Sequence, residues 1–187
     1  MNTTTTNAAT TTWTLDSLHS TVGFSIRHMM ITNVRGEFQK VTGTARYDAA
    51  HPEAAVIQVS IPTASISTRE PQRDAHLKSA AFFDVENHPA ITFTSTRARS
   101  VGAGQIEVIG DLTMHGTTRE VTLAVNDITG EQKDHQGNQR IGASITGKIK
   151  RSDFGMTYNM VLEAGGIALS DEVAITIDIA LVKDKAA

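Results

Sequence analysis

VAITIDIAL, residues 173–181, is the stretch of sequence that decides the fold. Every second position holds Val, Ile or Leu, and the positions between them hold Ala, Thr, Asp and Ala. Alternate side chains of a β-strand point to opposite faces, so this stretch has one aliphatic face and one face of small or polar residues. Such a strand is typical of an antiparallel sheet that covers an apolar interior on one side and meets water on the other.

The same period of two recurs along most of the chain, for example over residues 22–26, 106–114, 121–125 and 141–149. The pattern predicts eight strands, over residues 20–29, 33–49, 54–62, 90–101, 104–114, 117–130, 138–152 and 172–184. Most connections are short and rich in turn residues, which favours antiparallel hairpins arranged as a meander. Eight such strands close into an up-and-down barrel, because closure leaves no strand edge exposed. The expected fold class is therefore all-β.

Three features interrupt this regular pattern. Residues 70–82, EPQRDAHLKSAAF, contain good helix formers and place Pro71 where a first helical turn tolerates proline. We expect one short helix here, near a barrel end. Residues 153–171 are long for a hairpin connection, which is typical of a functional lid or mouth. Gly43 is expected to bend the long strand at 33–49.

The composition is that of an ordinary globular chain. Its 187 residues include 40% hydrophobic and 20% charged residues, which suits one domain with a sizeable core. Residues 1–12 are mostly Thr, Asn and Ala, so we expect a disordered Thr-rich tail before a barrel domain at 13–184. The net charge is −3 and Lys and Arg are not clustered, so nucleic acid is not an expected partner.

The sequence contains no cysteine, which excludes a thiolate nucleophile, a disulfide and a zinc–thiolate site. It also lacks the charged and apolar pattern of a secretory signal and any run of about 18 apolar residues. The expected protein is therefore soluble and cytoplasmic, without a membrane span.

Motifs of catalysis are missing from the sequence. There is no GxSxG elbow, no phosphate-binding glycine loop and no pair of carboxylates that spacing brings together. Seven histidines are present, but none has the HExxH or i, i+4 spacing of a zinc hydrolase. His51, His88, His115 and His135 are interpreted as solvated turn residues. We therefore expect no catalytic residue and no metal site.

Three polar side chains are candidates for contact with a ligand. His28 continues the inward parity of residues 22–26, so it either hydrogen-bonds a neighbour inside the barrel or meets the polar head of a ligand. Arg73 and His76 lie on the expected helix, where they would reach the same head group at the rim. The alternative is that Arg73 and Asp74 form a local ion pair that only positions the helix.

Five methionines after the first residue fall at predicted strand ends or in the long loop. These are Met29, Met30, Met114, Met156 and Met160. Thioether side chains adapt to varied apolar shapes, so these methionines are interpreted either as a flexible apolar mouth of the barrel or as residues that fill gaps in the core. The inward set is otherwise aliphatic and aromatic, which predicts a deep interior suited to a chain-like hydrophobic ligand.

Several motifs occur in a fixed order along the chain. The first, W-x-L-D-x-x-H-S-x-V-x-F-x-x-x-H, runs from Trp13 to His28. It is followed by Val34, Gly36 and Phe38, by RDAHLKSAAFFD at 73–84, by Pro89 and Phe93, by GDLT at 110–113 with Gly116, and by SDFG at 152–155. In this order, over about residues 13–183, the motifs resemble the YceI-like, polyisoprenoid-binding family. Met30 departs from the family pattern, in which many members have glycine.

The resemblance implies a lipocalin-like barrel with a long apolar tunnel for an isoprenoid chain, such as a polyprenyl lipid or the tail of a quinone. It implies binding, storage or transport of that lipid, no enzymatic activity, and no cofactor besides the bound lipid. Many members are periplasmic or secreted, and many are dimers, so a homodimer is an expectation. The residues expected to bind the lipid are Phe24, Ile26, His28, Phe38, Arg73, His76, Phe82, Phe83, Phe93, Leu112, Met114, Phe154 and Met156.

Two other functions stay open at this point. One is an enzyme that acts on a small apolar substrate with His28 or His76 as acid or base, although no nucleophile, metal set or cofactor motif accompanies them. The other is a barrel packed solid and used as an interaction or stress-associated scaffold. An internal cavity of at least about 300 Å³ would favour binding over the scaffold.

Overall fold

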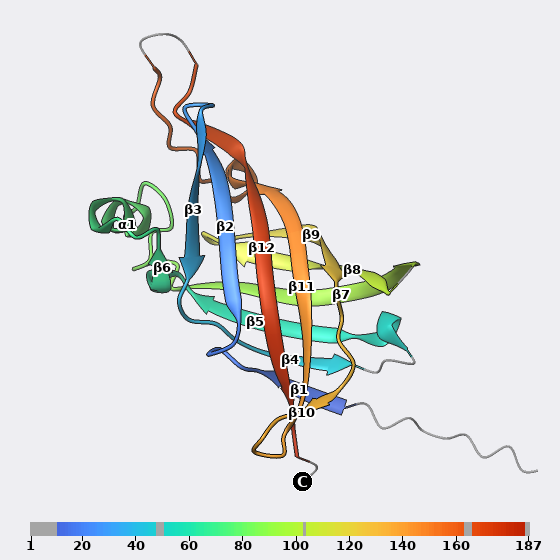
Figure 1. The fold of residues 1–187 in the computed structure, drawn as a ribbon. Coiled ribbons are helices and arrows are strands. Elements are labelled where there is room, and N and C mark those ends of the chain that lie inside the picture. The colour runs from blue at the N-terminus through green and yellow to red at the C-terminus, as the bar shows by residue number, and fades with distance from the viewer. Residues whose placement is uncertain (1–10, 48–50, 103, 163–165, 186–187) are drawn as a thin grey trace, which may run out of the picture.

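Eight antiparallel strands form a closed barrel within the described part of the chain (Figure 1). The computed structural model describes residues 11–47, 51–102, 104–162 and 166–185. Around the barrel the strands are β1 (Thr11–Leu15), β4 (Thr42–Tyr47), β5 (Val56–Pro62), β7 (Ala90–Gly102), β8 (Gln105–Met114), β9 (Thr117–Asn126), β11 (Gln139–Lys150) and β12 (Leu169–Lys183). β12 pairs with both β11 and β1, which closes the ring and confirms the predicted eight-stranded barrel. The strand predicted at 20–29 lies outside this ring, and β1 takes its place.

A flap of three strands extends the barrel wall beside β12. It consists of β2 (Thr21–His28), β3 (Thr32–Phe38) and β6 (Ile66–Ser67), which follow β12 in that order. One edge of β12 pairs with β2 along residues 169–178 and with β1 along residues 181–183. The remaining elements are β10 (Gln132–Lys133), α1 (Pro71–Lys78) and the 3₁₀ helices η1 (Pro52–Ala54), η2 (Thr63–Ser65) and η3 (Arg151–Phe154).

The predicted strand at 33–49 is wrong as a single element. It is divided into β3 and β4, which are separated at residues 39–41 rather than bent at Gly43. β3 pairs with β2 and β6, whereas β4 pairs with β1 and β5. The two halves are therefore divided because each one finds its partners in a different part of the wall.

β1 is a strand that the period of two does not predict. Thr11 and Thr12 pair with Tyr47 and Arg46 of β4, so the predicted disordered tail at 1–12 extends too far. Residues 1–10 lie outside the described residues. A threonine-rich segment shows no alternation, and this one becomes a strand through backbone pairing with β4 and β12.

α1 confirms the predicted helix but ends before the predicted limit of 70–82. Glu70 is the N-cap, and its carboxylate accepts hydrogen bonds from two backbone N–H groups of the first turn, which Pro71 begins. Ser79 leaves the helix in an extended conformation. The helix stands beside β6 and outside the barrel wall (Figure 1), and none of its residues is buried.

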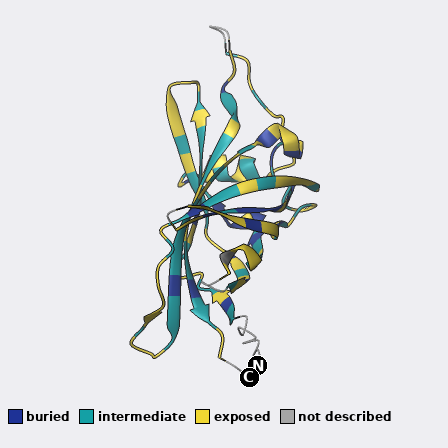
Figure 2. Ribbon diagram, turned by 90° about the vertical axis from the view of Figure 1, so that its right-hand side faces the viewer, coloured by how far each residue is buried: buried dark blue, intermediate teal, exposed yellow. Residues whose placement is uncertain are grey.

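Inward-facing side chains of β12 confirm the predicted alternation but are not all buried. Val173, Ile175, Ile177, Ile179 and Leu181 all face the interior, and only Leu181 is buried. Figure 2 shows the same intermediate burial along much of the sheet. Inward side chains that stay partly accessible indicate a hollow barrel rather than one filled by its own side chains.

A group of charged side chains lies at the barrel end that carries β10. Arg140 Nη1 lies 2.6 Å from Asp16 Oδ2, and Arg140 Nε lies 2.7 Å from Asp134 Oδ2. His19 Nδ1 lies 2.9 Å from the same oxygen of Asp16. Hydrogen bonds from Arg140 and then from His19 lower the pKa of Asp16 to about 2. Arg140 and the backbone N–H of Asn138 hold the pKa of Asp134 below its usual range.

Acid is expected to weaken the interactions within this charged group. Each carboxyl has a lower pKa in the folded than in the unfolded chain, where aspartate titrates near pH 4, so its contribution is present above about pH 4 and is lost as the pH falls toward 2. Arg140→Gln removes the cause of the shift. We therefore expect the variant to be less stable near neutral pH and to show a flatter loss of stability between about pH 4 and 2. Urea unfolding at several pH values measures both effects, and parallel pH profiles for the two proteins would contradict the assignment.

Candidate ligand-binding cavity

The barrel encloses an elongated cavity of about 590 Å³. Its longest wall is β12, whose inward side chains line it from Val173 to Leu181. At roughly 3.3 Å per residue, this part of the wall is about 26 Å long. The inward faces of β8, β9 and β11 complete the lining with residues such as Val108, Leu123 and Ile145. The cavity is thus long and almost entirely aliphatic or aromatic.

All but one of the residues expected to bind a ligand line this cavity. They are Phe24, Ile26, His28, Phe38, Arg73, His76, Phe82, Phe83, Phe93, Leu112, Met114 and Met156. The exception is Phe154, whose side chain is 1% exposed and packs in the core beside the cavity rather than against it. Its place follows from η3, the short helix that directs Phe154 into the protein while Met156 reaches the lining.

One aromatic row runs along the flap side of the cavity. The ring of Phe38 lies 5.8 Å from that of Phe24 and 5.8 Å from that of Phe83, between ring centroids. Gly36 makes this row possible, because a Cβ at this position would collide with the Phe24 ring and would lie 2.8 Å from the Thr68 methyl group. The segment after α1 is therefore joined to the flap by aromatic packing.

A second aromatic group lies where α1 meets the long segment before β12. The His76 ring packs edge-on against Phe82 at 5.1 Å and against Tyr158 at 4.9 Å, and Phe82 lies 5.1 Å from Tyr158. Tyr158 lines the cavity but is not among the residues expected from the sequence. Tyr158 lies in a segment whose apolar residues show no regular spacing, so its place in the cavity lining could not be predicted from the sequence. Its ring contacts with His76 and Phe82 show that it belongs to this group.

Polar side chains at the cavity are few, and two of them are arginines held by hydrogen bonds. Arg73 donates from Nε to Thr68 Oγ1 at 2.7 Å and from Nη2 to the Thr68 carbonyl at 3.0 Å. Asp74 accepts from the Thr68 backbone N–H at 2.7 Å. The expected local ion pair of Arg73 and Asp74 is therefore replaced by joint binding to Thr68, which is buried.

Arg151 is the other arginine, and it is 6% exposed. Its guanidinium donates to the carbonyls of Met156 at 2.7 Å, Tyr158 at 2.8 Å and Ser170 at 3.0 Å. These bonds hold the segment that carries Tyr158 against the end of β12. Burial lowers the pKa of Arg151, but a guanidinium remains protonated at every physiological pH.

His28 lines the cavity at the end of β2, as its parity predicts. In the sheet, His28 pairs with Thr32 of β3 on one side and with Leu169 of β12 on the other. No aspartate, glutamate or lysine of the described residues lines the cavity. The available polar groups therefore suit contact with one polar head, and no carboxylate stands near His28 or His76 within the lining to complete an acid–base pair.

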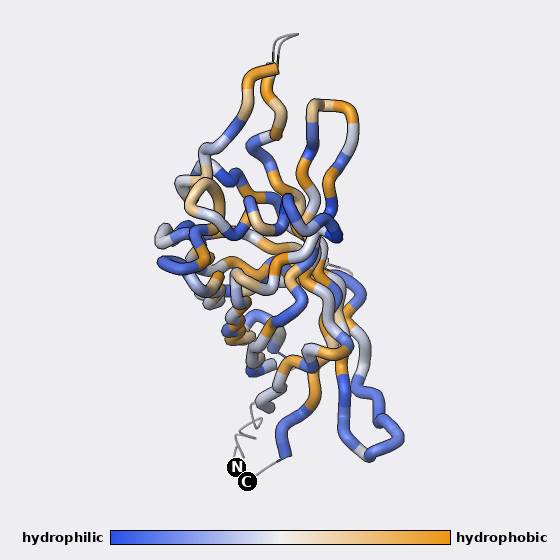
Figure 3. The backbone as a smooth tube through the Cα atoms, turned by 90° about the vertical axis from the view of Figure 1, so that its left-hand side faces the viewer, coloured by the Kyte–Doolittle hydropathy of each residue, from blue (hydrophilic) through white to orange (hydrophobic). Residues whose placement is uncertain are grey.

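Two segments that contain exposed apolar residues reach the upper end of the molecule in Figure 1. The β2–β3 turn and the segment before β12 both reach this end (Figure 3). The exposed residues are Met29, Met30, Ile31, Met160, Val161 and Ile167. Met114 and Met156, in contrast, are buried core residues. Met29, Met30 and Met160 therefore agree with an apolar barrel mouth, whereas Met114 and Met156 agree with ordinary filling of the core.

Two of the expected solvated histidines are half-buried instead. The rings of His88 and His115 pack against each other with centroids 4.8 Å apart, and His115 Nδ1 lies 3.1 Å from the Phe154 carbonyl oxygen. His51 and His135 are exposed, as expected. His88 and His115 lie in turns that are far apart in the sequence, so the spacing of histidines along the chain could not reveal their contact.

No helix of the described residues has the length and hydrophobicity needed to cross a membrane.

Comparison with known proteins identifies a matching family pattern and similar sequences. The pattern of a family described as the YceI-like domain matches residues 13–181. A UPF0312 protein of Ectopseudomonas mendocina (strain ymp) is 39% identical over 142 residues, which are 76% of this chain and 74% of that protein.

Two solved structures share the fold. Burkholderia cenocepacia BcnA has a TM-score of 0.78 at 22% identity, over 89% of this chain and 98% of its own. A polyisoprenoid binding domain from Saccharophagus degradans, implicated in plant cell wall breakdown, has a TM-score of 0.66 at 15% identity, over 92% of this chain and 98% of its own.

Proposed function

Because the chain belongs to the YceI-like domain family, as the match over residues 13–181 shows, we propose that it binds a long apolar isoprenoid-type lipid inside its barrel. A polyprenyl chain or the tail of a quinone fits this description. The protein would store the lipid or carry it through water. The fold shared with a polyisoprenoid binding domain supports this choice of ligand.

The observation that carries the proposal is the cavity of about 590 Å³. It lies within the range of about 300–1,000 Å³ that is usual for small-molecule sites. An apolar wall about 26 Å long suits a chain rather than a compact ligand, because each buried methylene gains about 0.8 kcal/mol. A barrel used only as a packed scaffold would have no reason to keep this space open.

The polar groups support one orientation of the ligand. His28, Arg73 and His76 lie along the side formed by the flap and α1, whereas Ile179 and Leu181 line the far end of β12. A polar head near His28 would leave the chain to extend along β12 toward Leu181. This arrangement also favours binding over catalysis, since the lining offers histidines without a carboxylate partner.

Protein purified from a bacterial host is expected to carry a prenyl lipid. Extraction of the intact protein with organic solvent, followed by mass spectrometry, detects the lipid and gives its ratio to protein. An unrelated soluble protein prepared from the same cells controls for carried-over membrane lipid. An extract free of lipid at high protein load would contradict the proposal.

His28→Ala is expected to weaken lipid retention modestly. A lost neutral hydrogen bond to a head group is worth about 1 kcal/mol, or about a fivefold loss of affinity. Competition with a fluorescent prenyl analogue measures the change, and His51→Ala is the control because His51 is exposed and does not line the cavity. If the protein instead showed a turnover that fell by about 100-fold in His28→Ala, general acid–base catalysis would be the better explanation.

A further inference from the structure

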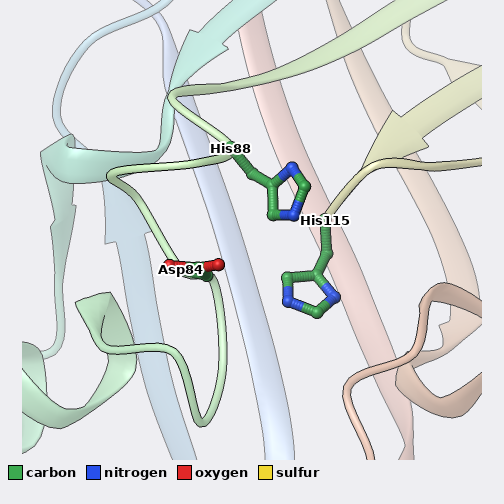
Figure 4. Close-up of side chains that lie close together, drawn as sticks. All are labelled: Asp84, His88 and His115. Carbon is green, nitrogen blue, oxygen red and sulfur yellow. The ribbon is translucent and has the colours of Figure 1, made fainter.

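Asp84, His88 and His115 form a cluster beside the cavity that the lipid proposal does not use. One carboxylate oxygen and one ring nitrogen from each histidine all lie within 4.8 Å of one another. Figure 4 shows the three side chains close together, with Asp84 and His88 on one turn of the chain and His115 on another. All three residues are half-buried, so the cluster lies below the surface yet remains accessible to an ion.

The backbone holds the three side chains in place. Asp84 and His115 both adopt the left-handed conformation, with φ of 46° and 50°, which few residues other than glycine take up. The His88 backbone N–H donates to the Asp84 carbonyl at 2.8 Å, so these two residues are fixed in one turn. Gly116 leaves room for His88, since a Cβ there would lie 2.8 Å from the His88 ring.

Neighbouring groups orient two of the three donors. His115 Nδ1 lies 3.1 Å from the Phe154 carbonyl oxygen. A carbonyl only accepts, so Nδ1 carries the proton and the lone pair of Nε2 is left for another partner. Asp84 Oδ2 accepts a hydrogen bond from Asn87 Nδ2 at 2.9 Å. Histidines that bind metals are usually oriented in this way, with the second ring nitrogen donating to a carbonyl or carboxylate.

We propose that Asp84, His88 and His115 bind one divalent transition-metal ion of the zinc class. Two imidazoles and one carboxylate are ligands that zinc accepts, with a fourth position left for water. Donor atoms in a tetrahedral zinc site lie about 3.3 Å apart, given bonds of about 2.0–2.1 Å. The donor atoms of the cluster, which lie within 4.8 Å of one another, therefore have to move closer together to bind the ion.

A bound ion would join three segments that form one end of the cavity. Asp84 follows Phe83, and His115 follows Met114, and both of these apolar residues line the cavity. His115 is also bonded to η3 through the Phe154 carbonyl. The ion would therefore act as a clamp between the turn after α1, the β8–β9 turn and η3. This inference does not depend on the identity of the lipid.

The test uses the full chain without an affinity tag, stripped of metal and lipid. Titration with ZnCl₂ in a calorimeter is expected to give one saturable site per chain, and Co²⁺ is expected to give the visible absorption of a low-coordinate nitrogen and oxygen site. Zinc should also raise the thermal midpoint, because an ion that binds only the folded chain stabilises it by mass action.

Variants decide whether the cluster is responsible. His88→Ala and His115→Ala should each weaken zinc binding by at least about 100-fold, the upper end of what loss of a supporting partner causes. Asp84→Asn, which keeps the size of the side chain and its bond to Asn87, should weaken binding without unfolding the protein. His135→Ala is the matched control, since His135 is exposed. Circular dichroism verifies that each variant is folded.

Two results would overturn the proposal. One is the absence of a saturable zinc site in the wild-type protein. The other is binding that survives unchanged in Asp84→Asn and in whichever histidine variant remains folded, because the zinc would then lie on scattered surface histidines. Either result would leave the lipid proposal intact, since lipid retention is measured without zinc.

Discussion

Replacing Ala143 with tryptophan is expected to empty the barrel of most of its lipid. Ala143 faces the cavity from β11, opposite Ile179 of β12. An indole at this position would fill the path along β12 that we assign to the lipid chain. We expect the amount of lipid per protein to fall by at least about tenfold, which corresponds to about 1.4 kcal/mol of binding free energy. Extraction and mass spectrometry give this ratio directly.

The stability of lipid-free protein distinguishes a hollow barrel from a packed one. Enlarging a residue in a packed core usually destabilises a protein by about 1–3 kcal/mol. In an open tunnel the indole gains contacts, so lipid-free Ala143→Trp should be at least as stable as lipid-free wild type. Thr146→Trp is the control, because Thr146 lies on the same strand, is exposed and does not face the cavity. Wild-type lipid content in Ala143→Trp would mean that the lipid lies elsewhere.

Arg151→Ala is expected to destabilise the protein by about 3 kcal/mol or more. The change leaves the carbonyls of Met156, Tyr158 and Ser170 without their donors. The bond to the Met156 carbonyl is buried and the other two are partly buried, and a buried polar group without a partner typically costs about 1–3 kcal/mol. The segment that carries Tyr158 would also lose its attachment to β12, so lipid retention should fall together with stability.

Urea unfolding of lipid-free protein measures the loss. The control is Arg97→Ala, which removes an arginine whose side chain is 60% exposed and pairs with Glu120 on the surface. An exposed ion pair is worth about 0–1 kcal/mol, so this variant should stay close to wild type. Similar losses in both variants would show that the buried hydrogen bonds of Arg151 contribute no special stability.

Local patterns in the sequence were sufficient to predict the fold class. Alternation along residues 173–181 assigned the inward positions from Val173 to Leu181 correctly, because neighbouring side chains of a strand must point to opposite faces. The helix start followed from Pro71 for an equally local reason, since the first helical turn tolerates proline, whereas the capping role of Glu70 became clear only in the structure. Most of the cavity lining could be predicted in the same way.

Contacts between distant segments decided the rest. β1 is a strand because of pairing with β4 and β12, whose partners lie far along the chain, and no local period marks it. The break at residues 39–41 has the same origin, since β3 and β4 pair with different strands. Backbone pairing satisfies N–H and C=O groups irrespective of side chains, so it leaves little trace in a sequence.

The side chains that converge on one place depended most on the tertiary structure. Phe154 is directed away from the cavity by η3, and Tyr158 is brought to it by the hydrogen bond of its carbonyl to Arg151. Asp84, His88 and His115 come from two turns separated by β7 and β8. Spacing along a chain predicts which residues share a face, but closure of the barrel determines which turns meet, and closure is a property of all its strands together.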